Sequence, residues 1–356
     1  MTTPTDIPAE GVLPVSATAS WPELNERVQR LGLLRSSTGY YWFKIASNAL
    51  LYVATIAVLL LVGDSWWQLL TAVLAAFSFI QTAYIAHDAG HRQVARGKRG
   101  TEVAGIVHMN LLLGVTFGWW VAHHNKHHAG PNNLDRDPDT SRRIVAFAAS
   151  ELPVKAVSPF RRFVIRNQRL MFFVLLGQEA VRMRKAGFVA ARAGLLRRPG
   201  LELSIVVFHL AGYLALVFTV LSPLTAVCFV LVHQVLFGLF LGGVFAPNHK
   251  GMPVYRDDQE LDWLHKQVLT SRNIRSGRLA DYLFGGVNYQ IEHHLFPTMT
   301  RANLRRARPV VREYCDEHSV SYHEVSALDS YLEVASHLGG VAGEARAWMR
   351  GRRLPR

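Results

Sequence analysis

The chain has 356 residues, of which 50% are hydrophobic and 18% are charged. This composition excludes a disordered tail, a collagen-like chain and a disulfide-stapled module, the last because only Cys228 and Cys315 are present. A formal net charge of +13 is typical of nucleic-acid-binding proteins, but the mean hydropathy of +0.12 is too high for a soluble domain this basic. We therefore expect the apolar residues to be concentrated in a lipid bilayer, and we expect no nucleic acid as a partner.

Long apolar stretches begin after a polar start. Residues 1–20 contain no Lys or Arg and no long apolar run, so we predict a flexible leader over residues 1–39. Four uncharged stretches follow, at 46–62, 66–86, 203–221 and 223–246. A spanning helix needs about 20 predominantly apolar residues, so each stretch is long enough to cross a bilayer. Very short connectors join the first two stretches and the last two, which predicts two helical hairpins.

Lys and Arg are distributed very unevenly around these four spans. Four precede the first span, 19 lie between the hairpins and 16 follow the last span, while the two short connectors contain none. Because loops rich in Lys and Arg stay in the cytoplasm, this asymmetry predicts that both termini and the large middle segment are cytoplasmic. The same positive charge favours contact with anionic lipid headgroups.

A fifth uncharged stretch, 103–122, is also long enough to span a membrane. Arg92, Lys98 and Arg99 precede it and Lys126 follows it, so both of its ends are predicted to be cytoplasmic. We therefore interpret this stretch as interfacial or re-entrant.

These patterns predict an all-α integral membrane protein with two transmembrane hairpins and a cytoplasmic helical cap. The membrane domain would cover residues 40–312, and residues 313–356 would form a cytoplasmic helix and a basic tail. Membrane lipid is then an expected partner.

Histidine is unusually frequent, with 16 residues, and half of them are clustered beside the predicted spans. His87 and His91 directly follow the second span, and positions i and i+4 of a helix share one face. A second box contains His124, His127 and His128, whose spacing again places three rings on one helix face.

Two further groups complete the pattern. Gln290, His293 and His294 share a helix face, and Asn248 and His249 follow the fourth span. Every box lies at a predicted cytoplasmic span end or in a cytoplasmic segment, so all of them can converge on one site at the membrane face. Convergence requires both ends of 103–122 to lie on the same side, which supports the re-entrant interpretation.

Eight histidines are candidate metal ligands: His87, His91, His124, His127, His128, His249, His293 and His294. Imidazole suits iron, zinc or copper, and eight rings are too many for one four-coordinate zinc, so we expect two metal ions with open positions. A site of this kind facing an apolar phase suits activation of O2 against hydrocarbon, which redox-inactive zinc cannot perform. Asn248 and Gln290 are candidates for water-mediated contacts, and Asp88 and Glu292 for orienting ligand imidazoles.

The motifs are HDAGH (87–91), HHNKHHAGPN (123–132), APNHKG (246–251) and GGVNYQIEHHLFPTMTRANL (285–304). In this order the chain resembles the membrane fatty acid desaturase family, over about three quarters of its length. Its QIEHH sequence is most similar to front-end acyl desaturases. The third box there has Gln290 in place of a histidine.

The resemblance implies a di-iron enzyme that uses O2 and two electrons to insert a cis double bond into an acyl chain. Two iron ions would be held by the eight histidines, and no catalytic residue beyond the metal ligands is expected. The acyl group would be carried by coenzyme A, acyl-carrier protein or phospholipid. Many front-end relatives contain a fused haem domain with a His-Pro-Gly-Gly motif, which this sequence lacks, so we expect a separate donor such as a ferredoxin or a flavoprotein reductase.

Two alternatives stay open at this point. A fatty acyl or lipid hydroxylase would use the same di-iron scaffold and differ only in the product. A membrane metal transporter is the more remote alternative, because transporters place polar ligands near the bilayer midplane rather than at span ends.

Overall fold

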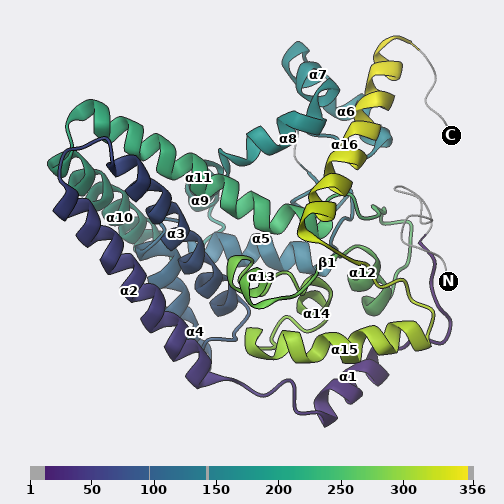
Figure 1. The fold of residues 1–356 in the computed structure, drawn as a ribbon. Helices are drawn as coiled ribbons and strands as arrows, with labels where there is room; N and C mark the ends of the chain where they lie inside the picture. Colours follow the sequence, from purple (N-terminus) through teal and green to yellow (C-terminus); the bar gives the residue numbers. More distant parts are fainter. Residues whose placement is uncertain (1–12, 96, 142–143, 352–356) are drawn as a thin grey trace.

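The structure is a computed structural model that describes residues 13–95, 97–141 and 144–351. Helices dominate the described chain (Figure 1). Its first half contains α1 (Trp21–Arg30), α2 (Thr38–Val62), α3 (Gln68–Gly90), α4 (Lys98–Gly105), α5 (Phe117–Ala129), α6 (Leu152–Lys155), α7 (Pro159–Arg166), α8 (Gln168–Leu176) and α9 (Glu179–Arg192). Its second half contains α10 (Pro199–Val220), α11 (Pro223–His249), α12 (Trp263–Leu269), α13 (Arg278–Leu283), α14 (Gln290–Leu295), α15 (Arg301–Glu317) and α16 (Ala327–Met349). A π-helical turn (Ile106–Leu111), a 3-10 turn (Ala149–Glu151) and the strands β1 (Asn273–Ile274) and β2 (Glu324–Val325) lie between them.

Four helices, α2, α3, α10 and α11, are long and apolar enough to cross a membrane. They overlap the four uncharged stretches, which confirms the predicted all-α membrane fold with four spans. Their 22 to 27 residues extend roughly 33–40 Å, enough for the hydrocarbon core of a bilayer. α3 is the most buried of the four, whereas α2 and α10 expose most of their apolar side chains, as lipid-facing helices do. The protein is therefore an integral membrane protein.

The two hairpins touch at their tips. The backbone N–H of Ser222, between α10 and α11, donates to Asp64 Oδ1 between α2 and α3, at 3.0 Å. This contact aligns the two hairpins side by side, with the opposite ends of all four spans meeting the rest of the chain.

Segment 103–122 folds as two helices joined by a π-helical turn and a tight bend. The turn lies against α10, where the Leu111 carbonyl accepts a hydrogen bond from His209 Nδ1 at 2.8 Å. Gly114 has a φ of +68°, and a Cβ there would lie 2.4 Å from His209 Cδ2, so only glycine fits the bend. The chain returns toward the start of α10, where Glu202 Oε2 accepts a hydrogen bond from the Gly118 N–H at 2.9 Å. The segment folds back on itself, so His124 on α5 lies at the same end of the spans as His91.

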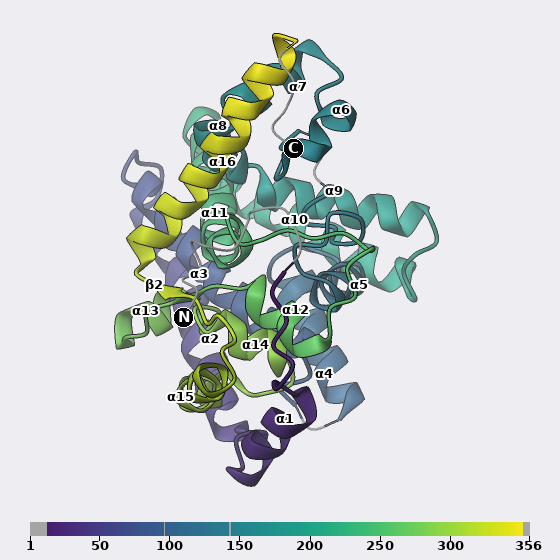
Figure 2. The same ribbon diagram turned by 90° about the vertical axis from the view of Figure 1, so that its right-hand side faces the viewer.

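Shorter helices form a cap over this end of the spans (Figures 1 and 2). An apolar cluster that includes Leu264, Ile291 and Val311 joins α12, α14 and α15. Strands β1 and β2 pair in parallel, with Asn273 opposite Glu324. The cap thereby holds the third histidine box, on α14, beneath a packed apolar core.

The prediction of a flexible leader over residues 1–39 is wrong from Leu13 onward, and residues 1–12 lie outside the described chain. Leu13, Leu24 and Val28 are buried in the same apolar cluster of the cap. Leu24 and Val28 are four residues apart on α1 and so share its buried face. The prediction rested on the lack of Lys and Arg in residues 1–20. The spacing of Leu24 and Val28 is that of an amphipathic helix and indicated an ordered segment.

The last long helix, α16, lies against α8 rather than against the spans' outer ends (Figures 1 and 2). Val334 and Leu338 of α16 form an apolar cluster with Phe172 and Leu176 of α8. α7, α8 and α16 thus form an arm beside α11.

Candidate metal centre

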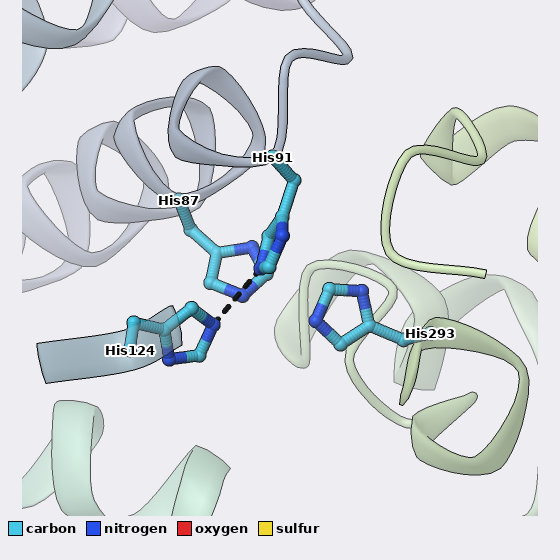
Figure 3. Close-up of side chains that lie close together, drawn as sticks. All are labelled: His87, His91, His124 and His293. Carbon is cyan, nitrogen blue, oxygen red and sulfur yellow. Dashed lines mark hydrogen bonds between the residues drawn. The ribbon is translucent and has the colours of Figure 1, made fainter. Parts of the chain in front are cut away.

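The first group of histidines comes from three helices that are distant in sequence. His87 and His91 lie at the C-terminal end of α3, His124 lies on α5 and His293 on α14 (Figure 3). Each offers a ring nitrogen, and these nitrogens all lie within 4.8 Å of one another. His91 Nε2 and His124 Nε2 are 2.9 Å apart. The four rings face a common centre.

A second group lies beside the first. It contains His127 of α5, His249 of α11 and His294 of α14, again with nitrogens within 4.8 Å of one another. His249 Nε2 is 3.2 Å from His127 Nε2 and 3.1 Å from His294 Nε2. His128 connects the groups, because its Nε2 lies 3.1 Å from His124 Nε2 and its ring stacks on His294 at a centroid distance of 4.0 Å. All eight predicted ligand candidates therefore meet in one cluster.

In the second group, the Nδ1 atom of each ring points away from the cluster and makes a hydrogen bond. His127 Nδ1 donates to both Asp137 carboxylate oxygens at 3.1 Å, and His294 Nδ1 contacts Gln267 Oε1 at 2.9 Å. His249 Nδ1 donates to the Thr270 carbonyl at 3.0 Å. Such contacts fix the tautomer and ring orientation, so that Nε2 is presented to the cluster with its lone pair.

Burial shifts the protonation of the cluster toward neutral rings. Desolvation, reinforced by the neighbouring imidazoles, lowers the pKa of His91, His124, His128, His293 and His294. For His127, burial also lowers the pKa, but the adjacent Asp137 carboxylate raises it by more, so the net shift is upward. Neutral imidazole is the form that binds metal ions.

In the first group, two buried ring nitrogens have no hydrogen-bond partner within the described chain. They are His87 Nε2 and His293 Nε2 of the first group. A buried polar atom without a partner is unfavourable, and a metal ion between these rings would satisfy both nitrogens. An imidazole-rich donor set without thiolate suits iron, zinc or copper. The residues present thus fit a metal centre.

Asn248 and Gln290 lie at the edge of the second group. Gln290 Nε2 is 2.8 Å from His249 Nε2, and its Oε1 accepts a hydrogen bond from Asn248 Nδ2 at 3.1 Å. Asn248 also donates to the Val287 carbonyl at 3.0 Å. Gln290 therefore contacts the edge of His249 that faces the cluster, while Asn248 donates a hydrogen bond to the other end of the Gln290 amide.

The two acidic residues within the boxes differ in what they contact. Asp88 Oδ1 lies 3.2 Å from His87 Nδ1, the position expected of an orienting carboxylate. Glu292 instead accepts hydrogen bonds from Asn273 Nδ2 and the Tyr322 hydroxyl, both at 2.8 Å, and contacts no imidazole among its hydrogen-bond partners. Burial raises the pKa of Glu292 to about 7 despite these two donors. The predicted role of Glu292 in orienting a ligand ring therefore does not agree with its contacts. Through Asn273 this side chain connects α14 to β1 instead.

Sequence reasoning missed Asp137 and Gln267 as partners of the ligand rings. Asp137 lies in a polar loop after the second box, and Gln267 lies on α12 within an otherwise unremarkable helix. Neither lies three or four residues from its histidine on a shared helix, so the sequence gives no sign of the contact and only the folded chain shows it. His123, which is not among the eight candidate ligands, contacts Asp139 at 3.0 Å through its Nε2.

Aromatic side chains and a small cavity adjoin the cluster. The Trp120 ring stacks on His124, with centroids 4.5 Å apart and planes inclined by 22°. A cavity of about 130 Å³ is lined by His124, His127 and His249, by apolar groups such as Leu241 and Phe245, and by charged groups that include Glu179, Arg182 and Lys250. This cavity, called the slot below, therefore adjoins the histidines, and its lining contains both apolar and charged side chains.

Fold and site together define an integral membrane protein whose histidines are arranged for metal binding at the ends of its spans. Its sequence matches the family described as fatty acid desaturase over residues 64–326, which is most of the chain. The chain belongs to the fatty acid desaturase family.

Three relatives illustrate the similarity. The chain is 32% identical to an acyl-lipid (9-3)-desaturase of Physcomitrium patens, over 91% of this chain and 62% of the relative. It is 28% identical to a Delta(6)-fatty-acid desaturase of Caenorhabditis elegans, over 92% of this chain and 76% of that protein. It is 27% identical to a Delta(8)-fatty-acid desaturase of Arabidopsis thaliana, over 89% of this chain and 73% of that protein. The chain thus spans less than two thirds of the moss protein and about three quarters of the other two.

Proposed function

We propose that the protein is a membrane-bound fatty acyl desaturase that introduces a cis double bond into an acyl chain with O2 and two electrons from a separate redox protein. The observation that carries this proposal is the meeting of eight histidines in one cluster, seven of them in two adjacent groups with His128 between, beside a partly apolar cavity. The names of the related desaturases support the same activity.

The eight histidines would hold two iron ions, one beside each group. Bound iron with O2 as co-substrate supplies the oxidising power that removal of hydrogen from an unactivated methylene requires. Burial lowers the pKa of His91, His124, His128, His293 and His294 and so favours their neutral form. Asp137, Gln267 and Thr270 orient the rings of the second group. The chain also excludes water, since the cluster lies between the spans and the packed cap.

The slot supplies the second requirement, which is position. A saturated acyl chain offers no polar group near the reacting carbons, so the protein must hold it by shape. Trp119, Leu241 and Phe245 line the same cavity as His124, His127 and His249 and would hold one stretch of the acyl chain beside them. Which carbons react then depends on how far the chain can enter.

The distribution of Lys and Arg supports a site at the cytoplasmic face, with both termini on the same side. The same charge supports an acidic electron donor, because opposite charges speed the encounter of two proteins. A ferredoxin or a flavoprotein reductase has the required chemistry.

Lipid profiling by mass spectrometry tests the proposal. The protein would be expressed with a ferredoxin and its reductase. The measurement is the amount of acyl chains that have lost two hydrogen atoms relative to the host's own acyl chains. His124→Ala should abolish the product, whereas His123→Ala, the neighbouring histidine outside the cluster, should retain it. Equal product from both variants would overturn the assignment, and a product with an added oxygen atom would mean hydroxylation instead.

A further inference from the structure

A second cavity, called the span cavity below, lies between the four spans. Its volume is about 230 Å³, and residues of α2, α3, α10, α11 and the π-helical turn line it. Among the described residues, none lines both this cavity and the slot beside the histidines. Phe208 and Gly212, one turn apart on α10, line the span cavity and are exposed. The cavity therefore opens on the outer surface of the spans, where lipid would surround them.

The lining of the span cavity is mostly apolar and rich in aromatic rings. It contains no Asp, Glu, Lys or Arg among the residues that the structure describes. Its aromatic side chains are Tyr52, Phe79, Phe208, Tyr213 and Phe229. A charged group in these surroundings would have no partner, at a large cost in free energy. The cavity thus suits a neutral molecule with a flat, apolar body.

Two residues that line the span cavity carry a buried polar atom without a hydrogen-bond partner in the described part of the chain. They are His233, through Nε2, and Ser78, through Oγ. Each lies near the middle of its span, α11 or α3, where hydrocarbon offers no water as a partner. Buried polar groups are normally hydrogen-bonded, so an oxygen atom of a ligand in this cavity would satisfy what the chain leaves open.

The neighbours of His233 show which kind of hydrogen bond its Nε2 can make. Arg184 Nη1 donates to Gln234 Oε1 at 2.6 Å, so the NH2 group of that amide is at the other end. This NH2 group lies 3.3 Å from His233 Nδ1 and can only donate, and the Tyr213 hydroxyl lies 2.8 Å from the same nitrogen. His233 Nδ1 is therefore the acceptor of a neutral ring, whose proton is on Nε2. The unpartnered atom is thus a donor, and a ligand must bring an acceptor oxygen to it.

We propose that the span cavity binds a membrane quinone. A quinone is neutral and flat, and its two carbonyl oxygens can accept hydrogen bonds from His233 Nε2 and from the Ser78 hydroxyl. Its apolar tail would pass Phe208 into the surrounding lipid. The ester oxygens of a phospholipid are held near the membrane surface by the charged headgroup, whereas both donors lie near the middle of spans. This binding goes beyond the proposed desaturase function and does not depend on it.

Ligand binding to the purified full chain tests the proposal without iron or turnover. The protein is delipidated in detergent and titrated with decylubiquinone, a quinone with a short apolar tail, and the complex is measured by native mass spectrometry. We expect one quinone per chain. Ser78→Ala and His233→Phe each remove one donor and should weaken binding about tenfold. In the infrared spectrum, a carbonyl stretch of the bound quinone should move to lower wavenumber, and His233→Phe should abolish that shift.

A matched pair of glycine variants tests the location of the quinone. A Cβ on Gly212 or on Gly200 would meet no atom within 4 Å, and both glycines lie on α10, but of the two only Gly212 lines the span cavity. Gly212→Leu places a side chain at the mouth of the cavity and should weaken quinone binding about tenfold, whereas Gly200→Leu should leave it unchanged.

Four results would overturn the proposal. The first is the absence of a quinone complex with the wild type, and the second is equal affinity in Gly212→Leu and Gly200→Leu. The third is binding of 1,2-dioctanoylglycerol as tight as that of decylubiquinone, which would mean a neutral acyl lipid instead. The fourth is unchanged affinity in the donor variants, which would mean that His233 contacts only the Phe79 ring, at a centroid distance of 4.4 Å. If His233→Phe fails to fold, Ser78→Ala decides, because the Ser78 hydroxyl has no hydrogen bond within the described residues to lose.

Discussion

Asp88 and Arg301 form a buried ion pair that joins the end of α3 to the start of α15. The Asp88 carboxylate also accepts a hydrogen bond from the Tyr41 hydroxyl at 3.0 Å, and Arg301 donates to the Tyr84 carbonyl at 2.8 Å. Asp88 directly follows His87, and Arg301 begins the helix after the third box. The pair therefore fixes the position of the first box relative to the third.

Replacement of this carboxylate should destabilise the protein strongly. Asp88→Asn leaves the Arg301 charge buried without its partner, so we expect the free energy of unfolding to fall by about 3–5 kcal/mol. Denaturant unfolding of the purified protein in detergent measures the change. Asp257→Asn removes an exposed partner of Arg136 and should have little effect. Similar stabilities for the two variants would contradict the role assigned to Asp88.

The carboxylate of Asp137 should control metal affinity through His127. Asp137→Asn weakens the hydrogen bond that orients the ring, and we expect affinity for iron at the second group to fall about 10–100-fold. Competition with a chelator, read by metal analysis, measures the affinity. Asp135→Asn is the matched control, because Asp135 pairs with Arg256 at the surface and contacts no histidine among its bonded partners. Unchanged iron binding in Asp137→Asn would show that the ring is oriented by other contacts.

Gly90 should resist substitution by even the smallest side chain. A Cβ there would lie 2.4 Å from Trp120, whose ring stacks on His124. Alanine normally favours a helix over glycine, but here overpacking should cost about 1–3 kcal/mol and reduce desaturation by displacing His124. Thermal unfolding and product analysis check both effects. Gly200→Ala has open space around it and should be neutral, so a Gly90→Ala enzyme that matches it in both measurements would contradict the argument.

Membrane orientation can be tested by cysteine labelling in intact cells. Ser65→Cys places a thiol in the connector between α2 and α3, and Asp258→Cys places one on the exposed surface of the cap. Because Lys and Arg concentrate on the cap side, we expect a membrane-impermeant maleimide to label Ser65→Cys from outside and Asp258→Cys only after permeabilisation. The reverse pattern would invert the proposed topology.

The spans and the histidine boxes were predictable because their signals are local. A run of apolar residues defines a span, and spacings of three and four place His124, His127 and His128 on one helix face regardless of the rest of the fold. The prediction that both ends of 103–122 lie on one side also came from the charge on both flanks. These features need no knowledge of which helices pack together.

The contacts that aim the ligands were not predictable in the same way. Asp137, Gln267 and Arg301 reach their partners only through tertiary packing, and no sequence spacing marks them. Glu292 shows the converse, since it adjoins His293 in the chain yet points to Asn273 and Tyr322 on the other side of α14. One residue along a helix turns the side chain by about 100°, so adjacency in a box does not mean adjacency in the site.

Helix α14 contributes one ligand to each histidine group, His293 to the first and His294 to the second. During synthesis the four spans and the first two boxes leave the ribosome before this helix exists. Neither group is then complete until the chain is nearly finished. A nascent chain that stalls before α14 would therefore lack one histidine of each group, His293 of the first and His294 of the second.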